Sequence, residues 1–415
     1  MEKHNTKGCA ARMTTAICIT VSLVFGLATG TAAQTEPQTW YVDSLATCSS
    51  GCGLSWASAF ATIQEGVDSA AAGDEIWVRQ GTYLLSATIT VDKAVAIYGG
   101  FAGTESVRSE RNWTTNITTV DGNNAVGCFY ISAEAILDGF TITNGNADLG
   151  AGISCWAAAS VNNCIISNNY AKNGAGGIFN NADSSITNCI ITGNSAGGNL
   201  AAILNFLCEP TISHCTIINN AGGIATALGD AYSPVITNCI LRGNGEEIFN
   251  EGSTPVITYC NIQGGYPGAS NIDADPLFDT NYRLRAGSPC IDSGTNTGVY
   301  TDMAGAARPQ GSGFDMGAYE YPDEQCSCIF GRITNMAPYI FIGLVRLSCG
   351  GNEVVAGAIP APDGYYAFST KAVAGGGYRL SPDAGVCTFD PTHSQITLPQ
   401  VQNVPYDFTS TCPAP

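Results

Sequence analysis

The chain is poor in basic residues and in histidine. It has 16 lysines and arginines and 3 histidines against 34 aspartates and glutamates, so its formal net charge at pH 7 is −18. A surface with this excess of negative charge repels phosphate backbones and anionic lipid headgroups. The composition therefore excludes nucleic acids and anionic membranes as expected partners, and it weakens the case for binding a polyanionic sugar.

Long apolar runs are also scarce. The longest extends from about Ala16 to Leu27, follows a basic stretch and ends in small residues. This order is typical of a secretory signal peptide, and we expect cleavage after Ala33. No later segment reaches the ~18 apolar residues that a membrane-spanning helix needs. We therefore expect a secreted protein, extracellular or at the cell surface, with no membrane span after cleavage and a net charge of about −20.

What the chain does have is a repeat built around cysteine. Five copies of nearly the same nonapeptide recur every 21 to 26 residues. The copies are VNNCIISNN (161–169), ITNCIITGN (186–194), ISHCTIINN (212–220), ITNCILRGN (236–244) and ITYCNIQGG (257–265), and a sixth, LDGFTITNG (137–145), has Phe140 in place of the cysteine. A period of about 24 residues with strand-forming residues and no helical segment predicts a solenoid of stacked β-coils.

Two positions of the repeat predict the interior of the coils. The cysteine and the apolar residue two positions later face the same way along a strand, so we expect the cysteines to stack inside as free, buried thiols. Asparagine stands five residues after the cysteine, tolerates left-handed backbone angles and can bond neighbouring backbone at a corner. The structural ladder predicted from these two positions consists of Cys164, Cys189, Cys215, Cys239, Cys260, Asn169, Asn194, Asn220 and Asn244.

Four parts are expected along the chain: a signal peptide (1–33), an N-terminal cap (34–80), the β-helix (81–321) and a β-sandwich (322–415). In the cap, apolar residues spaced three and four apart from Trp56 to Ala70 predict an amphipathic helix that Ser55 starts and Gly73 ends. Two blocks without the repeat, 273–294 and 302–321, are predicted to close the other end. Beyond Pro322, short alternating strands separated by Gly, Asn, Asp and Pro are typical of a sandwich.

The remaining cysteines fall into two groups. Cys48 and Cys52 are close enough in sequence for a local disulfide, which export permits. A second group, in the last ninety residues, provides further disulfide candidates whose connectivity stays open. These are Cys326, Cys328, Cys349, Cys387 and Cys412.

Residues 40–321 resemble secreted bacterial right-handed parallel β-helix proteins of the pectin-lyase-like superfamily, and within it the group with polymorphic outer-membrane-protein-like repeats. The blocks that carry the resemblance are WYVD…GLSWASAFATIQEGVDSAAAGDEIWVRQGTY, the GGI…ITNC-I-GN coils, DADPLF, YRLRAGSPCIDSG and GFDMGAYE. The segment after 321 resembles carboxypeptidase-regulatory or Cna B-type modules. The resemblance implies an all-β protein: a right-handed parallel β-helix solenoid with an N-terminal capping helix, followed by a small Ig-like β-sandwich.

The resemblance implies no single function. Catalytic members of the superfamily break or modify acidic polysaccharides, using a basic residue beside calcium-holding acids or a cluster of aspartates. The coils from 137 to 265 offer Lys172, Arg242 and His214 as their cationic or imidazole groups, with His214 expected to point outward. No pair of acids recurs on neighbouring coils. We therefore predict an exported, non-catalytic surface or adhesion-type scaffold whose loops contact an extracellular polysaccharide or another cell-surface component.

The alternative is a polysaccharide lyase or glycoside hydrolase acting on acidic polysaccharides. Its candidate residues are Arg242 as base or electrophile, with Glu246 and Glu247 as acids. Further candidate acids are Asp138, Asp148, Asp183 and Asp230. The aromatic residues Trp156, Tyr170, Phe179, Phe206 and Phe249 either form a sugar-stacking stripe or fill the corners of the coils.

No cofactor is expected, with calcium as the one open alternative. Asp273, Asp275 and Asp279 lie close enough in sequence to coordinate a hard cation. They also lie in a block where aspartates serve turn chemistry, and the nonapeptide calcium pattern of other β-rolls is absent. The ligand and the oligomeric state do not follow from the sequence.

Overall fold

The structure is a computed structural model that describes residues 37–197, 202–227 and 232–322, together with the backbone of the strands between 327 and 411. The predicted signal peptide lies outside the described residues, as do Cys326, Cys349, Cys387 and Cys412. No helix in the described part of the chain is long and apolar enough to cross a membrane.

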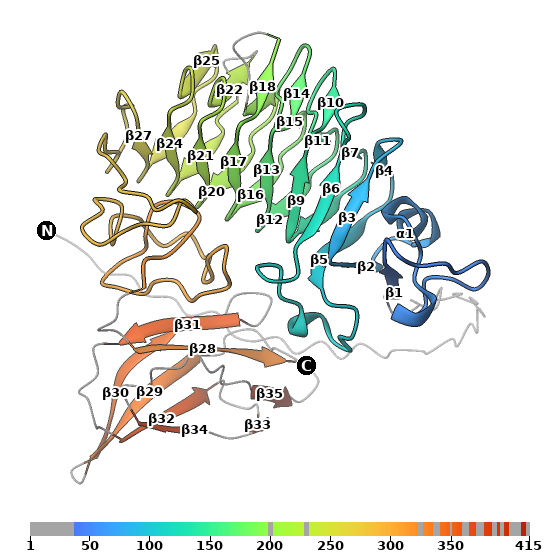
Figure 1. The fold of residues 1–415 in the computed structure, drawn as a ribbon. Helices are drawn as coiled ribbons and strands as arrows, with labels where there is room; N and C mark the ends of the chain where they lie inside the picture. The colour runs from blue at the N-terminus through green and yellow to red at the C-terminus, as the bar shows by residue number, and fades with distance from the viewer. Residues whose placement is uncertain are drawn as a thin grey trace, which may run out of the picture. The chain divides into compact units, whose positions relative to one another are not determined.

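The repeat folds as a parallel β-helix, in which each strand pairs in parallel with the equivalent strand of the next coil (Figure 1). Sheet A contains β1 (Thr39–Val42), β2 (Glu75–Arg79), β5 (Val95–Phe101), β8 (Ala135–Asp138), β12 (Ala159–Asn162), β16 (Ser185–Thr187), β20 (Thr211–Ser213), β23 (Val235–Thr237) and β26 (Val256–Thr258). Sheet B contains β3 (Gly81–Leu84), β6 (Thr118–Asp121), β9 (Phe140–Thr143), β13 (Ile165–Ser167), β17 (Ile190–Thr192), β21 (Thr216–Ile218), β24 (Ile240–Arg242) and β27 (Asn261–Ile262).

Two further sheets complete the coils. Sheet C contains β4 (Ile89–Val91), β7 (Phe129–Ile131), β11 (Ile153–Cys155), β15 (Ile178–Asn180), β19 (Ile203–Phe206), β22 (Ile224–Ala227) and β25 (Ile248–Glu251). The short sheet D contains β10 (Asn146–Ala147), β14 (Tyr170–Ala171) and β18 (Ser195–Ala196). The predicted all-β solenoid is confirmed.

The interior of the coils is mostly apolar, with an asparagine row at one corner and a second polar row on sheet C, where Asn180 Nδ2 donates to Asn205 Oδ1 at 2.9 Å. All five repeat cysteines are buried free thiols, and they pack with the inward isoleucines of sheets A, B and C in one core. The asparagines five positions later are also turned inward. Asn169 Nδ2 donates to Asn194 Oδ1 at 2.9 Å, Asn194 to Asn220 at 3.0 Å and Asn220 to Asn244 at 2.9 Å. Each amide of this ladder is thereby satisfied by its neighbour one coil away.

The left-handed residues of the corners are the neighbours of this ladder and not its members. The residue before each cysteine has φ between 51° and 55°; these are Asn163, Asn188, His214, Asn238 and Tyr259. The residue before each ladder asparagine has φ between 56° and 69°; these are Asn168, Gly193, Asn219 and Gly243. The left-handed conformation predicted at the ladder position was therefore assigned one residue too late.

The N-terminal cap differs from its prediction. Its helix, α1, spans Ile63–Ser69 and begins at Thr62, whose side chain accepts a hydrogen bond from the Glu65 backbone in a capping box. Trp56–Ser58 is a separate 3-10 turn, η1. The two do not join because Phe60 is extended and pairs with Val42 in β1. Ile63 and Val67 still face the core, so α1 covers the first coils (Figure 1).

The blocks predicted to close the far end only partly do so. Ile272 pairs with Asn261 on the last coil, and Cys290 accepts from the Asn261 side chain. The chain then runs back along the outside of the coils, where Trp113 Nε1 donates to the Met303 carbonyl at 2.8 Å. We call residues 273–321 the return segment. Its polar backbone finds partners on the corner residues, which is why it lies along the side.

The C-terminal segment forms two four-stranded sheets. One contains β31 (Tyr365–Thr370), β28 (Ser327–Thr334), β35 (Phe408–Thr411) and β33 (Thr388–Asp390), and the other β30 (Gly351–Ala358), β29 (Phe341–Ser348), β32 (Gly377–Asp383) and β34 (Ser394–Thr397). Its assignment to the carboxypeptidase-regulatory or Cna B-type modules stays a prediction.

The cysteine column provides a direct test of the interior. Cys215→Asp places a carboxylate where the thiol is fully buried and donates to the Ser213 and Ile186 carbonyls. An unpaired buried charge is expected to lower the free energy of unfolding by about 3–5 kcal/mol. Thr211→Asp, at an exposed position of β20, is the control and should cost under about 1 kcal/mol. Equal denaturation midpoints for the two variants would contradict the inward assignment.

Candidate functional site

Two of the three residues considered for catalysis, Arg242 and Glu247, have structural partners. Arg242 Nη1 lies 2.9 Å from Asp273 Oδ1 and 3.2 Å from Asn261 Oδ1 on the last coil. The Glu247 carboxylate accepts from the backbone N–H and the side-chain amide of Asn244, and so ends the asparagine ladder. Burial raises the pKa of Glu247. None of Arg242, Glu246 and Glu247 lines the cavities on the outer faces of sheets A and B.

The aspartates considered for calcium lie in separate turns. Asp273 pairs with Arg242, Asp275 accepts from the Leu277 backbone at 2.9 Å, and Asp279 accepts from the Asn281 and Arg283 backbones at 2.7 and 2.9 Å. Among the described residues no three His, Cys, Asp or Glu side chains converge in a way that could hold a metal ion.

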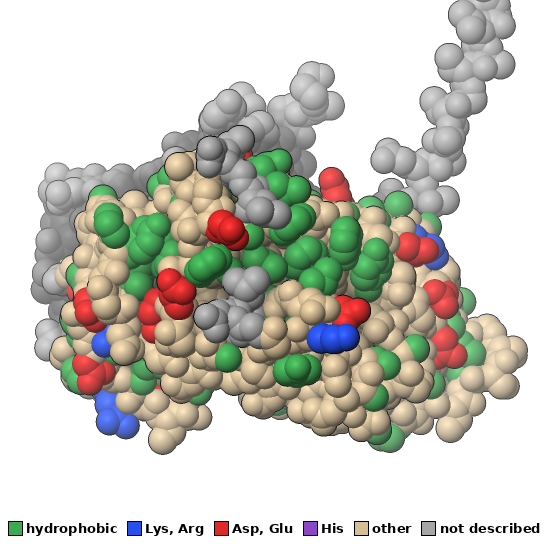
Figure 2. Space-filling model, turned by 90° about the horizontal axis from the view of Figure 1, so that it is seen from above, with side chains coloured by type: hydrophobic (Ala, Val, Ile, Leu, Met, Phe, Trp, Pro, Cys, Tyr) green, Lys and Arg blue, Asp and Glu red, His purple; other side chains and the backbone are tan. Residues whose placement is uncertain are grey.

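The aromatic row on sheet C is mainly a packing cluster. Figure 2 shows hydrophobic side chains gathered along this face of the coils. Phe179 is 4% exposed and packs with Leu204, while its ring lies 5.6 Å from Trp156 and 6.1 Å from Phe206. Trp156 remains 43% exposed. Because the central ring is covered, the row offers no continuous stacking surface.

The main cavity, of about 720 Å³, lies instead between the outer face of sheet A, the loop 102–117 and the return segment. Its floor is a row of side chains from consecutive coils. Tyr98 pairs in register with Asp138, Asp138 with Asn162, and Asn162 with Thr187. Residues at one register position point the same way on neighbouring strands, so the floor presents one polar side chain per coil.

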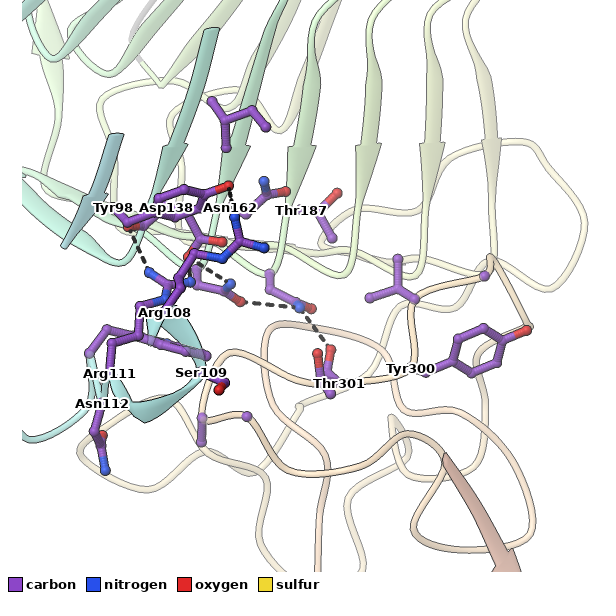
Figure 3. A pocket seen from close by; sticks show the side chains of 18 residues that line it. Tyr98, Arg108, Ser109, Arg111, Asn112, Asp138, Asn162, Thr187, Tyr300 and Thr301 are labelled. Atoms are coloured by element: carbon purple, nitrogen blue, oxygen red, sulfur yellow. Dashed lines mark hydrogen bonds and ion pairs between the residues drawn. The ribbon is translucent and has the colours of Figure 1, made fainter. Parts of the chain in front are cut away.

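Two arginines from the loop enclose this floor (Figure 3). Arg108 Nη1 donates to Tyr98 Oη at 2.9 Å and pairs with Glu75, and its guanidinium lies 4.6 Å from the Tyr98 ring centroid. Arg111 Nη2 lies 2.8 Å from Asp138 Oδ1, and its side chain is 8% exposed, against 33% for Arg108. Arg111 is therefore a positioning residue, while Arg108 presents part of its guanidinium to the cavity.

The third wall is tied to the corners of the coils. Asn163 Nδ2 donates to Asp138 Oδ1 at 3.0 Å, and Asn188 Nδ2 donates to the Thr301 carbonyl at 2.8 Å. This chain of amides connects the floor with the return segment, where Tyr300 and Thr301 line the cavity (Figure 3).

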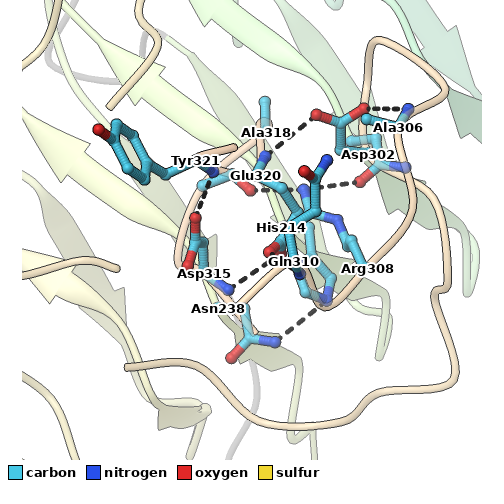
Figure 4. A network of polar contacts seen from close by, with 12 residues as sticks. His214, Asn238, Asp302, Ala306, Arg308, Gln310, Asp315, Ala318, Glu320 and Tyr321 are labelled. Carbon is cyan, nitrogen blue, oxygen red and sulfur yellow. Dashed lines mark hydrogen bonds and ion pairs between the residues drawn. The ribbon is translucent and has the colours of Figure 1, made fainter. Parts of the chain in front are cut away.

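A buried polar network anchors the return segment (Figure 4). Arg308 is fully buried; its Nη1 donates to Glu320 Oε1 at 2.6 Å, and its Nη2 to the Gly317 carbonyl at 2.9 Å and Asn188 Oδ1 at 3.3 Å. The Glu320 backbone N–H donates to Asp302 Oδ2 at 3.0 Å. The network connects the segment with itself and with the corner of β16.

His214 belongs to this network; its side chain points out of the coil, as predicted, but not into solvent. It is fully buried, with Nε2 2.9 Å from Thr297 Oγ1 and 3.0 Å from Asn238 Nδ2. Its side chain does leave the coil at the corner, but the return segment covers it there. Burial lowers the pKa of His214 well below its usual value, and the Arg308 charge adds to this.

Sequence reasoning missed the residues that form the main cavity, apart from Asp138. Arg108, Arg111 and Trp113 stand in the insertion SVRSERNWTTNI (106–117), outside the repeat. The available signal was the presence of two arginines beside a tryptophan in a chain with few basic residues. Of the other candidate acids, Asp148 and Asp183 are exposed and Asp230 lies outside the described residues.

The fold defines the class of protein as a parallel β-helix. The chain belongs to the family described as "Protein of unknown function (DUF1565)", whose model matches residues 52–261. No curated protein matches the sequence significantly. Among solved structures, "Crystal structure of pectate lyase Pel9A" is similar over 69% of this chain and 97% of that chain, with 13% sequence identity and a TM-score of 0.32.

The buried network predicts a pH dependence of stability. Burial, with the neighbouring Glu320 charge, raises the pKa of Asp315 from 3.8 to about 8. Between pH 3.8 and about pH 8, the Asp315 carboxyl is then protonated in the folded chain and ionised in the unfolded chain. The free energy of unfolding therefore falls as the pH rises through this interval. His214 has the opposite effect, but below its usual pKa of 6.5. We therefore expect the free energy of unfolding to decrease from about pH 6.5 to about pH 8.

Denaturant unfolding at several pH values checks this expectation. Asp315→Asn should flatten the decrease, whatever its effect on stability at one pH. Asp148→Asn, which changes an exposed carboxyl, should leave the slope unchanged. A slope that is the same in Asp315→Asn and the wild type would show that another group titrates.

Proposed function

We propose that the protein is an exported, non-catalytic β-helix scaffold at the cell surface that binds a glycan in the main cavity. The observation that carries the proposal is the polar floor. Tyr98, Asp138, Asn162 and Thr187 present hydrogen-bonding groups in one row, one coil apart, below a wall that contains Tyr300. Sugar hydroxyls need such a row of donors and acceptors, and the cavity has the size of a small-molecule site.

The charges of the cavity favour a neutral glycan. Arg111 is paired with Asp138, and Arg108 with Glu75, so neither guanidinium is an uncompensated positive charge. The formal net charge of the chain, −18, further disfavours a polyanion. A neutral sugar can accept hydrogen bonds from the exposed part of Arg108 without competing with these ion pairs.

The same pairing argues for binding without cleavage. Glycoside hydrolysis ordinarily uses two carboxyl groups on either side of the scissile bond. Among the described residues that line the main cavity, Asp138 is the single carboxylate. Arg111 forms an ion pair with its Oδ1, and Asn163 donates a hydrogen bond to the same oxygen. A single carboxylate engaged in this way does not provide the pair of carboxyl groups that flanks a scissile glycosidic bond.

Replacement of a floor residue tests the site. Asn162→Ala removes an amide from the floor and should weaken binding of a neutral oligosaccharide about five- to tenfold. Thr258→Ala is the matched control, because Thr258 occupies the same register position four coils away, outside the cavity. A glycan array would select the ligand and titration calorimetry would measure both variants. Equal loss in both, or no glycan bound by the wild type, would refute the proposal.

A reducing-end assay separates the proposal from the enzymatic alternative. The purified protein is incubated with acidic and neutral polysaccharides in the presence of calcium, and we expect no new chain ends. New ends that disappear in Arg242→Ala, or in the double replacement of Glu246 and Glu247 by alanine, would identify a lyase or hydrolase. The site would then lie on the last coils and not in the main cavity.

A further inference from the structure

A second cavity, of about 350 Å³, lies on the other side of Trp113 against sheet B. Its floor is formed by residues that pair in register on β9, β13 and β17: Thr141 with Ile165, and Ile165 with Ile190. Met303 and Tyr319 of the return segment pack against the same isoleucines. The floor is therefore more apolar than that of the main cavity.

Trp113 separates the two cavities. Its indole N–H donates to the Met303 carbonyl at 2.8 Å, and the side chain lies over Gly139, where a Cβ would come within 2.9 Å of the Trp113 Cβ. On the far side, the indole ring is 3.8 Å from the position of a Cβ on Gly305. The indole thus forms a partition, and a ligand of the second cavity does not need the main one.

Arg283 is the one charged side chain among the described residues that line the second cavity. Its guanidinium lies 4.0 Å from the ring centroid of Tyr319, which fixes the plane of the group. The nearby Asp279 carboxylate interacts electrostatically with Arg283 and accepts from the Asn281 and Arg283 backbones, but no hydrogen bond joins it to the guanidinium. A planar guanidinium held over an aromatic ring, without a paired carboxylate in the lining, suits a planar anion.

Tyr282 completes the wall in a costly backbone conformation. Its φ is 61°, a left-handed value that is unfavourable for a non-glycine residue. In this conformation its hydroxyl lies 3.3 Å from Thr192 Oγ1 and its ring meets Phe278 edge to face at 6.0 Å. The strain places an aromatic ring beside Arg283, and such strain is common where a side chain must contact a ligand.

We propose that the second cavity binds a small carboxylate with a flat apolar body. The body lies on Ile165 and Ile190 beside the rings of Trp113 and Tyr282, and the carboxylate accepts two hydrogen bonds from Arg283. Neither isoleucine can hydrogen-bond a sugar hydroxyl, and Arg283 repels a cation. This inference goes beyond glycan binding in the main cavity and does not depend on it.

Phenylacetate and phenylacetamide are suitable probes, since they share shape and differ in charge. Titration calorimetry with the purified protein should show saturable binding of phenylacetate, with at least about tenfold weaker binding of phenylacetamide. Arg283→Gln should weaken phenylacetate binding about tenfold or more. Arg283→Lys should weaken it by less, because lysine keeps the positive charge but lacks the two parallel N–H donors of the guanidinium. Arg285→Gln is the matched control: Arg285 is two residues away, exposed and outside the cavity lining.

Three results would overturn the proposal: no saturable phenylacetate binding up to about 10 mM, equal affinity for the amide, or equal losses in Arg283→Gln and Arg285→Gln. Circular dichroism and thermal melting of each variant distinguish a lost site from a lost fold. Asn162→Ala serves as a further control, since it should leave phenylacetate binding unchanged whether or not the main cavity binds a glycan.

Discussion

In-register stacking of the coils is the constraint on which the rest of the structure depends. In the repeat, each strand pairs residue for residue with its equivalent one coil away, so side chains of the same register lie against one another. A buried polar residue costs least where its equivalents can satisfy it. Asparagine meets this condition, because its amide both donates and accepts. The row from Asn169 to Asn244 therefore needs an acceptor at its open end, and the Glu247 carboxylate supplies it.

The same constraint explains how much of the fold the sequence predicts. A repeated position must be filled in the same way in every coil, so the burial of Cys215 or Ile217 can be read from one nonapeptide and checked against four others. The helix of the cap has no such repetition. Its apolar spacing from Trp56 onward fits one helix, but the pairing of Phe60 with Val42 divides it, and spacing alone does not reveal that pairing.

The candidate site could not be predicted in the same way, because residues outside the repeat create it. Arg108 and Arg111 stand in an insertion, and the opposite wall is the return segment, more than 180 residues later in the chain. A regular β-helix presents nearly flat faces, and a cavity forms only where another segment covers one of them. The burial of His214 has the same origin: its corner position directs the side chain out of the coil, and the return segment covers it there.

A repeating surface also creates a problem of register for any segment that docks on it. Each coil offers nearly the same corner, so an apolar return segment could shift by one coil with little change in its contacts. Polar contacts remove this ambiguity, because they need particular partners. Arg308 donates a hydrogen bond to the Asn188 side chain, and the Thr295 backbone exchanges two hydrogen bonds with the Asn238 side chain. The Met303 carbonyl accepts from Trp113, which stands outside the repeat.

Arg308 is buried together with Asp302, Asp315 and Glu320. Burying these charged groups is costly, and buried ion pairs add little net stability. Their value here is specificity, because a shift by one coil would leave the buried guanidinium facing His214 or Asn163 with its neighbouring contacts displaced. Both cavities depend on that specificity. Tyr300 lies over the floor of the main cavity, and Arg283 over that of the second, only when the return segment is docked in this one register.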